Sequence, residues 1–204
     1  MRQLLHVVIL IVLSIFLNSC KIDSQKKNVS KPLRITKTLP DVYIKTTDKA
    51  VWISRDTVFL NGDFFTGYLF ELNSRGDTSF VGSYFNGVEE GRHVRFHSNG
   101  LIAEERFFIN GKKDGIQRGW WPDGRTKFLF NCYDNELEGS FEEWSDSGIL
   151  LKQFHYDAGY EAGAQKLWWA NGAIRANYFV KDGRKYGLIG LKLCSNPYDS
   201  VSFK

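Results

Sequence analysis

Glycines recur along this chain at a constant interval of 24 residues, and this interval restricts the possible folds more than any other feature. Sixteen of the nineteen glycines fall in three columns of the repeat. The columns are Gly67, Gly91, Gly115, Gly139, Gly163 and Gly187; Gly76, Gly100, Gly124, Gly148 and Gly172; and Gly87, Gly111, Gly159 and Gly183, with Gly62 one residue out of phase. Asn135 occupies the remaining slot, and Asn is the residue that best replaces Gly at positive φ. The interval therefore predicts a repeat architecture with a fixed backbone conformation at each glycine.

The residues before these glycines indicate turns between strands. Pairs such as Asn99-Gly100 and Asp123-Gly124 lie between aromatic-rich runs, which predicts tight two-residue hairpin turns. Asn86-Gly87 and Asn110-Gly111 open a second and longer connection, which closes at Gly91 or Gly115. Each repeat is then strand, tight turn, strand and wider turn, and the body needs no helix.

An even repeat length places equivalent strand residues on the same face of a sheet in every repeat. Even-numbered positions hold Phe96, Trp120, Phe128 and Phe154, whereas odd-numbered positions are mixed and polar. Since one hairpin alone is marginally stable, we expect the hairpins to stack. The sequence predicts an all-β fold in which repeated antiparallel β-hairpins of 24 residues form an elongated single-layer sheet. The folded domain is expected over residues 41–204, with repeats at about 60–190.

The repeat pattern resembles a known family. Asn110 to Gly115, followed by Trp120 to Gly124, is similar to the MORN repeat in its bacterial variant. The resemblance covers about residues 60–190 and implies an elongated single-layer sheet of successive hairpins. Bacterial proteins with such repeats are often described as antitoxin-like components of toxin–antitoxin systems, and the resemblance implies that role as one alternative here.

The first residues are typical of a targeting segment. A short cationic start precedes an apolar run from Leu4 to Leu17, which is too short to span a bilayer comfortably. Leu17-Asn18-Ser19-Cys20 resembles a bacterial lipobox, which implies lipid attachment at Cys20; the alternative is an uncleaved anchor. We expect a lipoprotein signal peptide at residues 1–19, a lipidated flexible basic tether at residues 20–40, and a location in the bacterial cell envelope, facing the periplasm or the exterior.

Positive charge is concentrated beside the expected anchor. Residues 21–60 contain nine Lys and Arg against four Asp, whereas residues 61–204 have a net charge of −2. A basic segment next to a lipid favours anionic headgroups. The charge distribution therefore predicts membrane proximity and no nucleic-acid partner.

No motif for catalysis is present in the sequence. His93 and His97 are expected to be solvated strand residues about 13 Å apart along the strand, too far to share a metal. The doublets such as Glu89-Glu90 place their carboxylates on opposite faces of a strand, and no nucleophile elbow or phosphate-binding loop occurs. We expect no enzyme activity, no cofactor and no metal.

Cys132 and Cys194 are separated by about two and a half repeats. Strand spacing places them roughly 20 Å or more apart, beyond the reach of a disulfide. Two free thiols are expected, with Cys132 in the aromatic core.

A candidate binding surface lies at odd-numbered positions. Trp121 and Trp169 share one column of the repeat with His97, and Phe107 and Phe179 add exposed apolar area. Aromatic side chains on a wet sheet suit sugar rings, peptide strands or another protein. In the alternative, the curvature of the sheet or the segment from Val42 to Leu60 covers them. The sequence favours a non-catalytic protein-interaction module with an unknown partner; a carbohydrate- or peptidoglycan-binding lipoprotein and the antitoxin-like role are the alternatives.

Overall fold

The computed structural model describes residues 37–190 of the 204-residue chain. The expected signal peptide, Cys20 and Cys194 lie outside these residues. All regular structure in the described range is β-strand. No helix there is long and apolar enough to cross a membrane.

Eighteen strands are present in residues 37–190. They are β1 Tyr43–Lys45, β2 Val51–Ser54, β3 Thr57–Leu60, β4 Asp63–Phe64, β5 Gly67–Leu72, β6 Thr78–Phe85, β7 Val88–Glu89, β8 Gly91–Phe96, β9 Ile102–Ile109, β10 Lys112–Lys113, β11 Gly115–Trp120, β12 Thr126–Tyr133, β13 Glu136–Trp144, β14 Leu150–Asp157, β15 Tyr160–Glu161, β16 Gly163–Trp168, β17 Ile174–Lys181 and β18 Arg184–Leu188.

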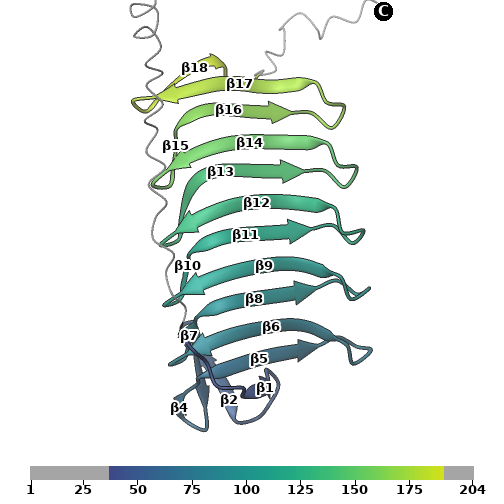
Figure 1. Cartoon of the computed structure of the whole chain (residues 1–204), viewed down its shortest axis with the longest axis vertical. Coiled ribbons are helices and arrows are strands. Elements are labelled where there is room, and N and C mark those ends of the chain that lie inside the picture. Colours follow the sequence, from purple (N-terminus) through teal and green to yellow (C-terminus); the bar gives the residue numbers. More distant parts are fainter. Residues whose placement is uncertain (1–36, 191–204) are drawn as a thin grey trace, which may run out of the picture. The chain divides into compact units, whose positions relative to one another are not determined.

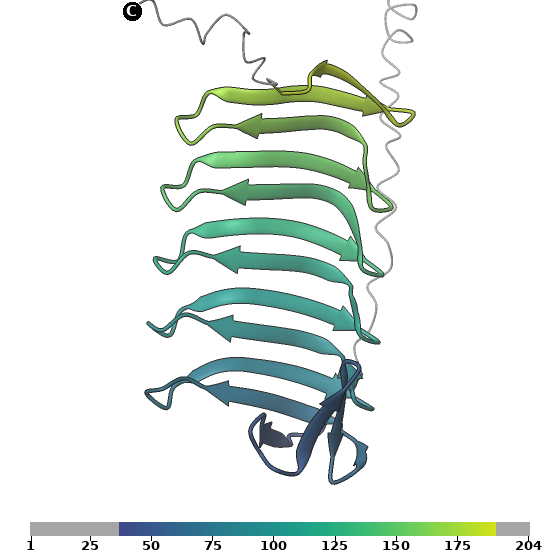
Figure 2. The same cartoon turned by 180° about the vertical axis from the view of Figure 1, so that it is seen from behind.

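Successive hairpins lie side by side in one large open sheet. Its strand order is β1-β5-β6-β8-β9-β11-β12-β13-β14-β16-β17-β18, and all neighbours except the parallel pair β1 and β5 are antiparallel. Figure 1 shows the hairpins stacked as a single layer, and the view from behind in Figure 2 shows no second layer formed by residues 37–190 over most of its length. The predicted all-β fold of stacked hairpins is confirmed.

The tight turns lie on one edge of the sheet, at the glycines for which we predicted the wider connection. Phe85 pairs with Val88, so Asn86 and Gly87 alone connect the strands, and their φ angles are 48° and 81°. Positive φ at both central residues is the type I′ geometry that suits the twist of a hairpin. Asn135 has a φ of 75° in the same column, as its substitution for Gly predicts.

The opposite edge carries the longer connections, so the prediction of a two-residue turn at Asn99-Gly100 is wrong. Phe96 pairs with Ile102, which leaves a five-residue loop. His97 N–H donates to Leu101 C=O at 2.8 Å, and Gly100 N–H donates to His97 C=O at 2.9 Å. Only the glycine of the pair has positive φ, since Asn99 is absent from the left-handed region. An Asn-Gly pair fits both the two-residue turn and the five-residue loop, so the pair alone does not distinguish them.

This loop shifts the side chains of the two strands relative to one another. Gln117 lies opposite Phe130, and the register shifts between Gly119 and Trp120. Odd-numbered residues of the first strand of each hairpin therefore share a face with even-numbered residues of the second. The expectation that Trp120 and Phe128 share a face on parity alone is wrong, because the bulge adds one residue to one strand.

Neighbouring hairpins are joined at the tight turns by a hydrogen bond that recurs every 24 residues. Gly111 N–H donates to Glu89 C=O, and Gly159 N–H donates to Leu137 C=O, at 2.8 and 3.0 Å. A side-chain acceptor adds a second bond, since Glu90 Oε2 accepts from Asn110 N–H at 2.9 Å. Thr66 and Glu138 accept equivalent bonds from the turns that follow them. The residue before Gly67, Gly91, Gly115 and Gly139 therefore holds the next turn.

Buried glutamines complete the junction where strand pairing stops. β9 and β11 pair directly over only two residues. Gln117 is fully buried beside this gap; its Nε2 donates to Phe107 C=O and its Oε1 accepts from Phe107 N–H, at 3.1 and 3.3 Å. Gln165 makes the same pair of bonds to His155. The side-chain amide thus replaces a missing backbone partner.

A small sheet closes the first end of the repeat array. β2, β3 and β4 form this sheet, and Val58 packs with Phe65, Leu69 and Tyr84 in a buried cluster. The segment from Val42 to Leu60 therefore packs on the first repeat. Lys37 is fixed nearby, because its Nζ lies 2.7 Å from Asn110 Oδ1 and 3.6 Å from the buried carboxylate of Glu90.

We expect Gln117→Leu to destabilise the protein by roughly 2–4 kcal/mol, because it leaves the N–H and C=O of Phe107 without partners. Urea denaturation measures the effect. Gln153→Leu is the matched control, since Gln153 is only half-buried and bonds to the side chain of Glu142. Equal stability of the two variants would contradict the proposed role of the buried amide.

Candidate functional site

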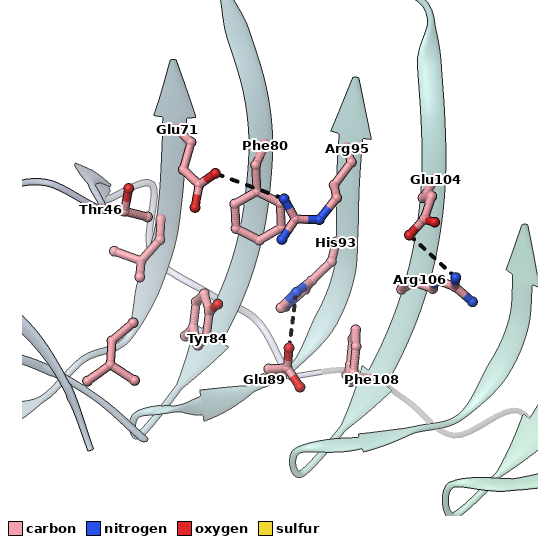
Figure 3. Close-up of a pocket in the computed structure, with 12 residues that line it drawn as sticks. Thr46, Glu71, Phe80, Tyr84, Glu89, His93, Arg95, Glu104, Arg106 and Phe108 are labelled. Atoms are coloured by element: carbon pink, nitrogen blue, oxygen red, sulfur yellow. Dashed lines mark ion pairs between the residues drawn. The ribbon is translucent and has the colours of Figure 1, made fainter. Parts of the chain in front are cut away.

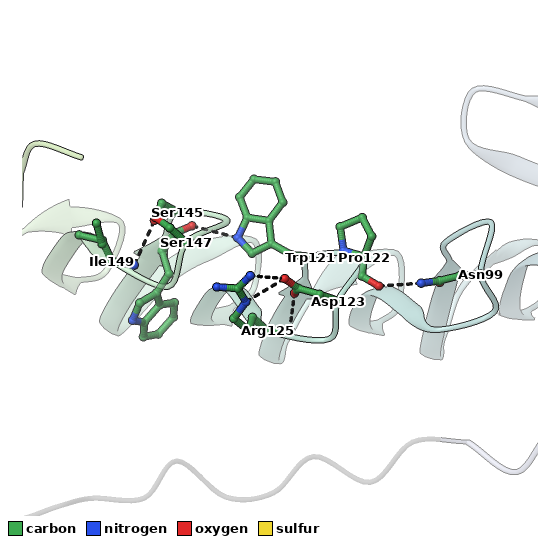
Figure 4. Close-up of polar contacts among 9 residues, drawn as sticks. Asn99, Trp121, Pro122, Asp123, Arg125, Ser145, Ser147 and Ile149 are labelled. Atoms are coloured by element: carbon green, nitrogen blue, oxygen red, sulfur yellow. Dashed lines mark hydrogen bonds and ion pairs between the residues drawn. The ribbon is translucent and has the colours of Figure 1, made fainter. Parts of the chain in front are cut away.

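Three of the predicted binding residues lie in the five-residue loops at one edge of the sheet. His97, Trp121 and Trp169 each begin such a loop. His97 Nε2 lies 2.9 Å from Trp120 C=O, and Trp121 Nε1 donates to Trp144 C=O at 3.2 Å, as Figure 4 shows for Trp121. Each bond joins one loop to the next repeat, so His97 and Trp121 have a structural contact. Trp169 is 46% exposed.

Cations lie over both tryptophans of this column. Lys127 Nζ is 4.6 Å from the centroid of Trp121, and Arg175 Cζ is 4.6 Å from that of Trp169. Beside Trp121, Asn99 Nδ2 donates to Pro122 C=O, and Arg125 pairs with Asp123 (Figure 4). The Arg125 guanidinium holds the pKa of the Asp123 carboxyl below its usual value.

Phe107 and Phe179 lie on the sheet, on the face away from most of the aromatic side chains. Phe107 pairs with Arg92, and Phe179 pairs with Ala164 and Tyr186. Phe179 is 50% exposed, whereas Phe107 is half-buried. The two lie three repeats apart, or about 29 Å at the usual strand spacing. The five predicted residues therefore do not form one site.

Two further predictions concern single residues. Cys132 is a free and buried cysteine, as predicted, and burial raises the pKa of its thiol. His93 is 4% exposed, so the prediction that it is solvated is wrong. The reason is the bulge of this hairpin, between Arg95 and Phe96, which places His93 on the same face as Phe80, Tyr84 and Phe108.

The structure brings together a different set of residues, in a hollow at the junction of the small sheet and the first two repeats. The hollow has a volume of about 320 Å³. Its lining includes Phe80 and Tyr84 from β6, His93 from β8 and Phe108 from β9, with Thr46 and Ile53 at the side of the small sheet. Figure 3 shows these side chains projecting from neighbouring strands towards a common space.

His93 lies between the aromatic rings of this hollow. Its ring centroid is 5.2 Å from that of Tyr84 and 4.6 Å from that of Phe108. Nε2 lies 2.8 Å from Ser83 C=O. Burial lowers the pKa of His93 to about 4, so the ring is neutral at pH 7. A carbonyl oxygen only accepts hydrogen bonds, so Nε2 carries the proton and Nδ1 is an acceptor.

Two loose ion pairs form the rim. Arg95 Nη1 is 3.9 Å from Glu71 Oε2, and Arg106 Nη2 is 3.4 Å from Glu104 Oε2 (Figure 3). Arg95 also stacks over the Phe80 ring, with Cζ 4.6 Å from the centroid.

Glu89 is the remaining acid of the hollow, and Tyr84 is its tyrosine. Glu89 Oε1 lies 3.6 Å from His93 Nδ1, and burial raises the pKa of its carboxyl. Burial, with the charge of Glu89 adding to it, raises the pKa of Tyr84 to about 12. Tyr84 therefore stays protonated at physiological pH.

The hollow presents hydrogen-bonding and aromatic groups to any molecule that enters it. The described residues contain no group of three or more His, Cys, Asp or Glu side chains placed to hold a metal ion. The hollow contains a buried neutral imidazole, an acid and aromatic rings, and it has no Ser, Cys or Lys nucleophile in its lining. Sequence reasoning missed this set because it spans three strands and a separate sheet. One signal was available, since His93 occupies a column of the repeat that holds Gln at 117 and 165.

No protein-family model matches the chain, and no curated protein matches its sequence. Function therefore has to be inferred from the geometry of the chain itself.

His93 predicts a pH dependence of stability. Its pKa is about 4 when folded and 6.5 when unfolded, so the unfolded state takes up the proton first as pH falls. The contribution of His93 is complete above about pH 6.5 and is lost as pH falls towards 4, a change of about 3 kcal/mol.

Urea denaturation between about pH 7 and about pH 4.5 tests this dependence, with His93→Gln removing the titrating group. We expect the wild-type protein to lose more stability than the variant over this range. Because Glu89 titrates with the opposite sign, the difference between the two proteins is the informative quantity. His155→Gln is the control, since His155 is an exposed strand histidine. Parallel pH profiles for the wild type and His93→Gln would contradict the assignment.

Proposed function

We propose that this chain is a membrane-anchored, non-catalytic protein-interaction module of the bacterial cell envelope, built on MORN-like repeats. The observation that carries the proposal is a row of aromatic side chains that no second layer covers in residues 37–190. We call it the aromatic face, and it consists of Phe128, Phe130, Phe141, Phe154 and Tyr156.

These rings pack side by side across three strands. Phe130 pairs with Phe141, and Phe141 pairs with Phe154. The centroids of Phe128 and Phe130 lie 5.6 Å apart, and those of Phe130 and Phe141 lie 5.1 Å apart. All but Phe154 are only half-buried. A contiguous apolar surface of this kind on a soluble domain usually marks an interaction site.

Cations on the aromatic face favour a protein over a glycan as the partner. Arg106 Cζ lies 4.6 Å from the Phe128 centroid, and Lys152 Nζ lies 4.4 Å from those of both Phe141 and Phe154. A sugar stacks on the face of an aromatic ring, and a stacked cation occupies that position. Mixed aromatic and arginine side chains are instead typical of protein interfaces. The same argument applies to Trp121 and Trp169, which the sequence suggested for sugar binding.

In this proposal, a lipid on Cys20 attaches the chain to the membrane. The basic segment at residues 20–40 supports contact with anionic headgroups. The resemblance of Leu17 to Cys20 to a lipobox supports the attachment. The antitoxin-like role comes from the MORN resemblance alone, and no contact in the described residues favours it.

Photo-crosslinking on two neighbouring strands tests the aromatic face. Lys152 on β14 lies on the aromatic face. Lys166 on β16 lies on the opposite face, because it pairs with Gln153, the neighbour of Lys152, whereas Lys152 pairs with Leu167. With a benzophenone amino acid at each position of the full-length protein in cells, we expect discrete protein adducts from position 152. Equal adducts from both positions, or adducts only from position 166, would show that this face is not the interface.

A separate experiment tests the anchor. We expect Cys20→Ser to abolish incorporation of a fatty-acid label and to move the protein from the membrane fraction to the soluble fraction. Cys132→Ser is the control, because Cys132 is buried in the sheet. If Cys20→Ser stays in the membrane fraction and the wild type incorporates no fatty-acid label, the result would favour an uncleaved anchor.

A further inference from the structure

His93 differs from the equivalent residues of other repeats in how its side chain bonds to the backbone. The column contains Leu69, His93, Gln117, Phe141 and Gln165. Each glutamine uses both its Oε1 and its Nε2 on the backbone of the residue ten positions earlier, and its Nε2 also donates to a second carbonyl. His93 serves the equivalent carbonyl, that of Ser83, with Nε2 alone. The other ring nitrogen of His93, Nδ1, is therefore not needed for this bond to the backbone.

That second nitrogen faces the hollow beside an acid. Glu89 Oε1 lies 3.6 Å from His93 Nδ1, on the side of the ring away from Arg95 (Figure 3). Nδ1 of the neutral imidazole is an acceptor, and so is Oε1 of the ionised Glu89 carboxylate. The hydrogen bond of the His93 ring uses Nε2. No fully buried side-chain nitrogen or oxygen of residues 37–190 lacks a partner, so Nδ1 is the part of this otherwise buried side chain that is open to the hollow.

We propose that this hollow binds a primary ammonium group on an aliphatic stem. An ammonium has three donors and no acceptor, so it can donate to His93 Nδ1 and to Glu89 Oε1 at once. The stem would lie against the rings of Tyr84 and Phe108. The site stands apart from the aromatic face of the later repeats, so either proposal can fail alone.

The charges of the hollow agree with a cationic ligand. Its lining contains three carboxylates, Glu71, Glu89 and Glu104, against Arg95 and Arg106. Each arginine pairs with one of the rim acids, which leaves Glu89 without a cation in the lining. Lys113 and Asp56 act on Glu89 from farther away and with opposite signs.

The repeat itself contains the combination only once. The positions equivalent to Glu89 hold Lys113, Leu137 and Glu161, and those equivalent to His93 in the same repeats hold Gln117, Phe141 and Gln165. Lys113 would repel an ammonium, and the Oε1 of Gln117 and of Gln165 is directed at a backbone N–H. The pair of Glu89 and His93 is therefore specific to one junction, although the structural need is common to several.

Titration of the full-length protein with n-pentylamine at about pH 7.5, followed by backbone amide NMR shifts, tests the site. We expect saturable shifts confined to β6, β8 and β9, and at least tenfold weaker binding of 1-pentanol, which has the same stem without the charge. Nα-acetyl-lysine methylamide and 1,5-diaminopentane then distinguish a lysine side chain from a free diamine as the natural source. Equal binding of pentanol and pentylamine would overturn the proposal.

The repeat supplies variants that keep the fold. His93→Gln places at this junction the residue that two other junctions use, and Glu89→Gln removes only the charge. We expect each to weaken pentylamine binding roughly tenfold or more. Glu161→Gln occupies the same column three repeats later and is expected to bind as the wild type does. Unchanged binding in both His93→Gln and Glu89→Gln would also overturn the proposal.

Discussion

A sheet of one layer has no second layer against which to bury either face, so the hydrogen bonds between neighbouring hairpins determine whether it holds together. Direct strand pairing across a junction is short, with two residue pairs between β9 and β11. Side chains supply the rest, through the glutamine amides in the gap and the acids that hold each following turn. The other features of the fold depend on these junctions.

The junctions also explain where chemistry can arise in so regular a molecule. Where the side chain of this column bonds to the backbone, as at His93, Gln117 and Gln165, a replacement keeps the junction only if it makes the same bond. His93 meets that requirement with one nitrogen and has another to spare, whereas Gln117 uses its amide completely. The hollow beside His93 therefore combines a structural requirement with a binding opportunity, and the small sheet of β2 to β4 provides its side wall.

The period, the all-β fold and the stacking of hairpins were predictable from sequence, because a glycine column reports directly on positive φ. Asn135, with a φ of 75°, shows how well that inference holds. The assignment of tight and wide turns was not predictable, since Asn-Gly suits both a type I′ turn and the end of a five-residue loop. One bulge at Gly119 and Trp120 was enough to exchange the faces of a strand.

The candidate site was harder to predict than the fold. His97 and Trp121 were expected on a binding surface, yet both bond to the end of a strand in the next repeat, because their column begins a turn and lies beyond the end of the strand. His93 was expected in solvent, and its burial depends on the equivalent bulge of its own hairpin, between Arg95 and Phe96. Glu90, Gln117 and the hollow depend on contacts between repeats, which the pattern within one repeat does not contain.

The central claim is that the junction holds His93 by Nε2 and leaves Nδ1 as an acceptor facing the hollow. The ¹⁵N chemical shifts of the His93 ring in the full-length protein at about pH 7 test it most directly. The account predicts one protonated nitrogen, Nε2, and one unprotonated nitrogen, Nδ1. A proton on Nδ1, or on both nitrogens, would contradict it.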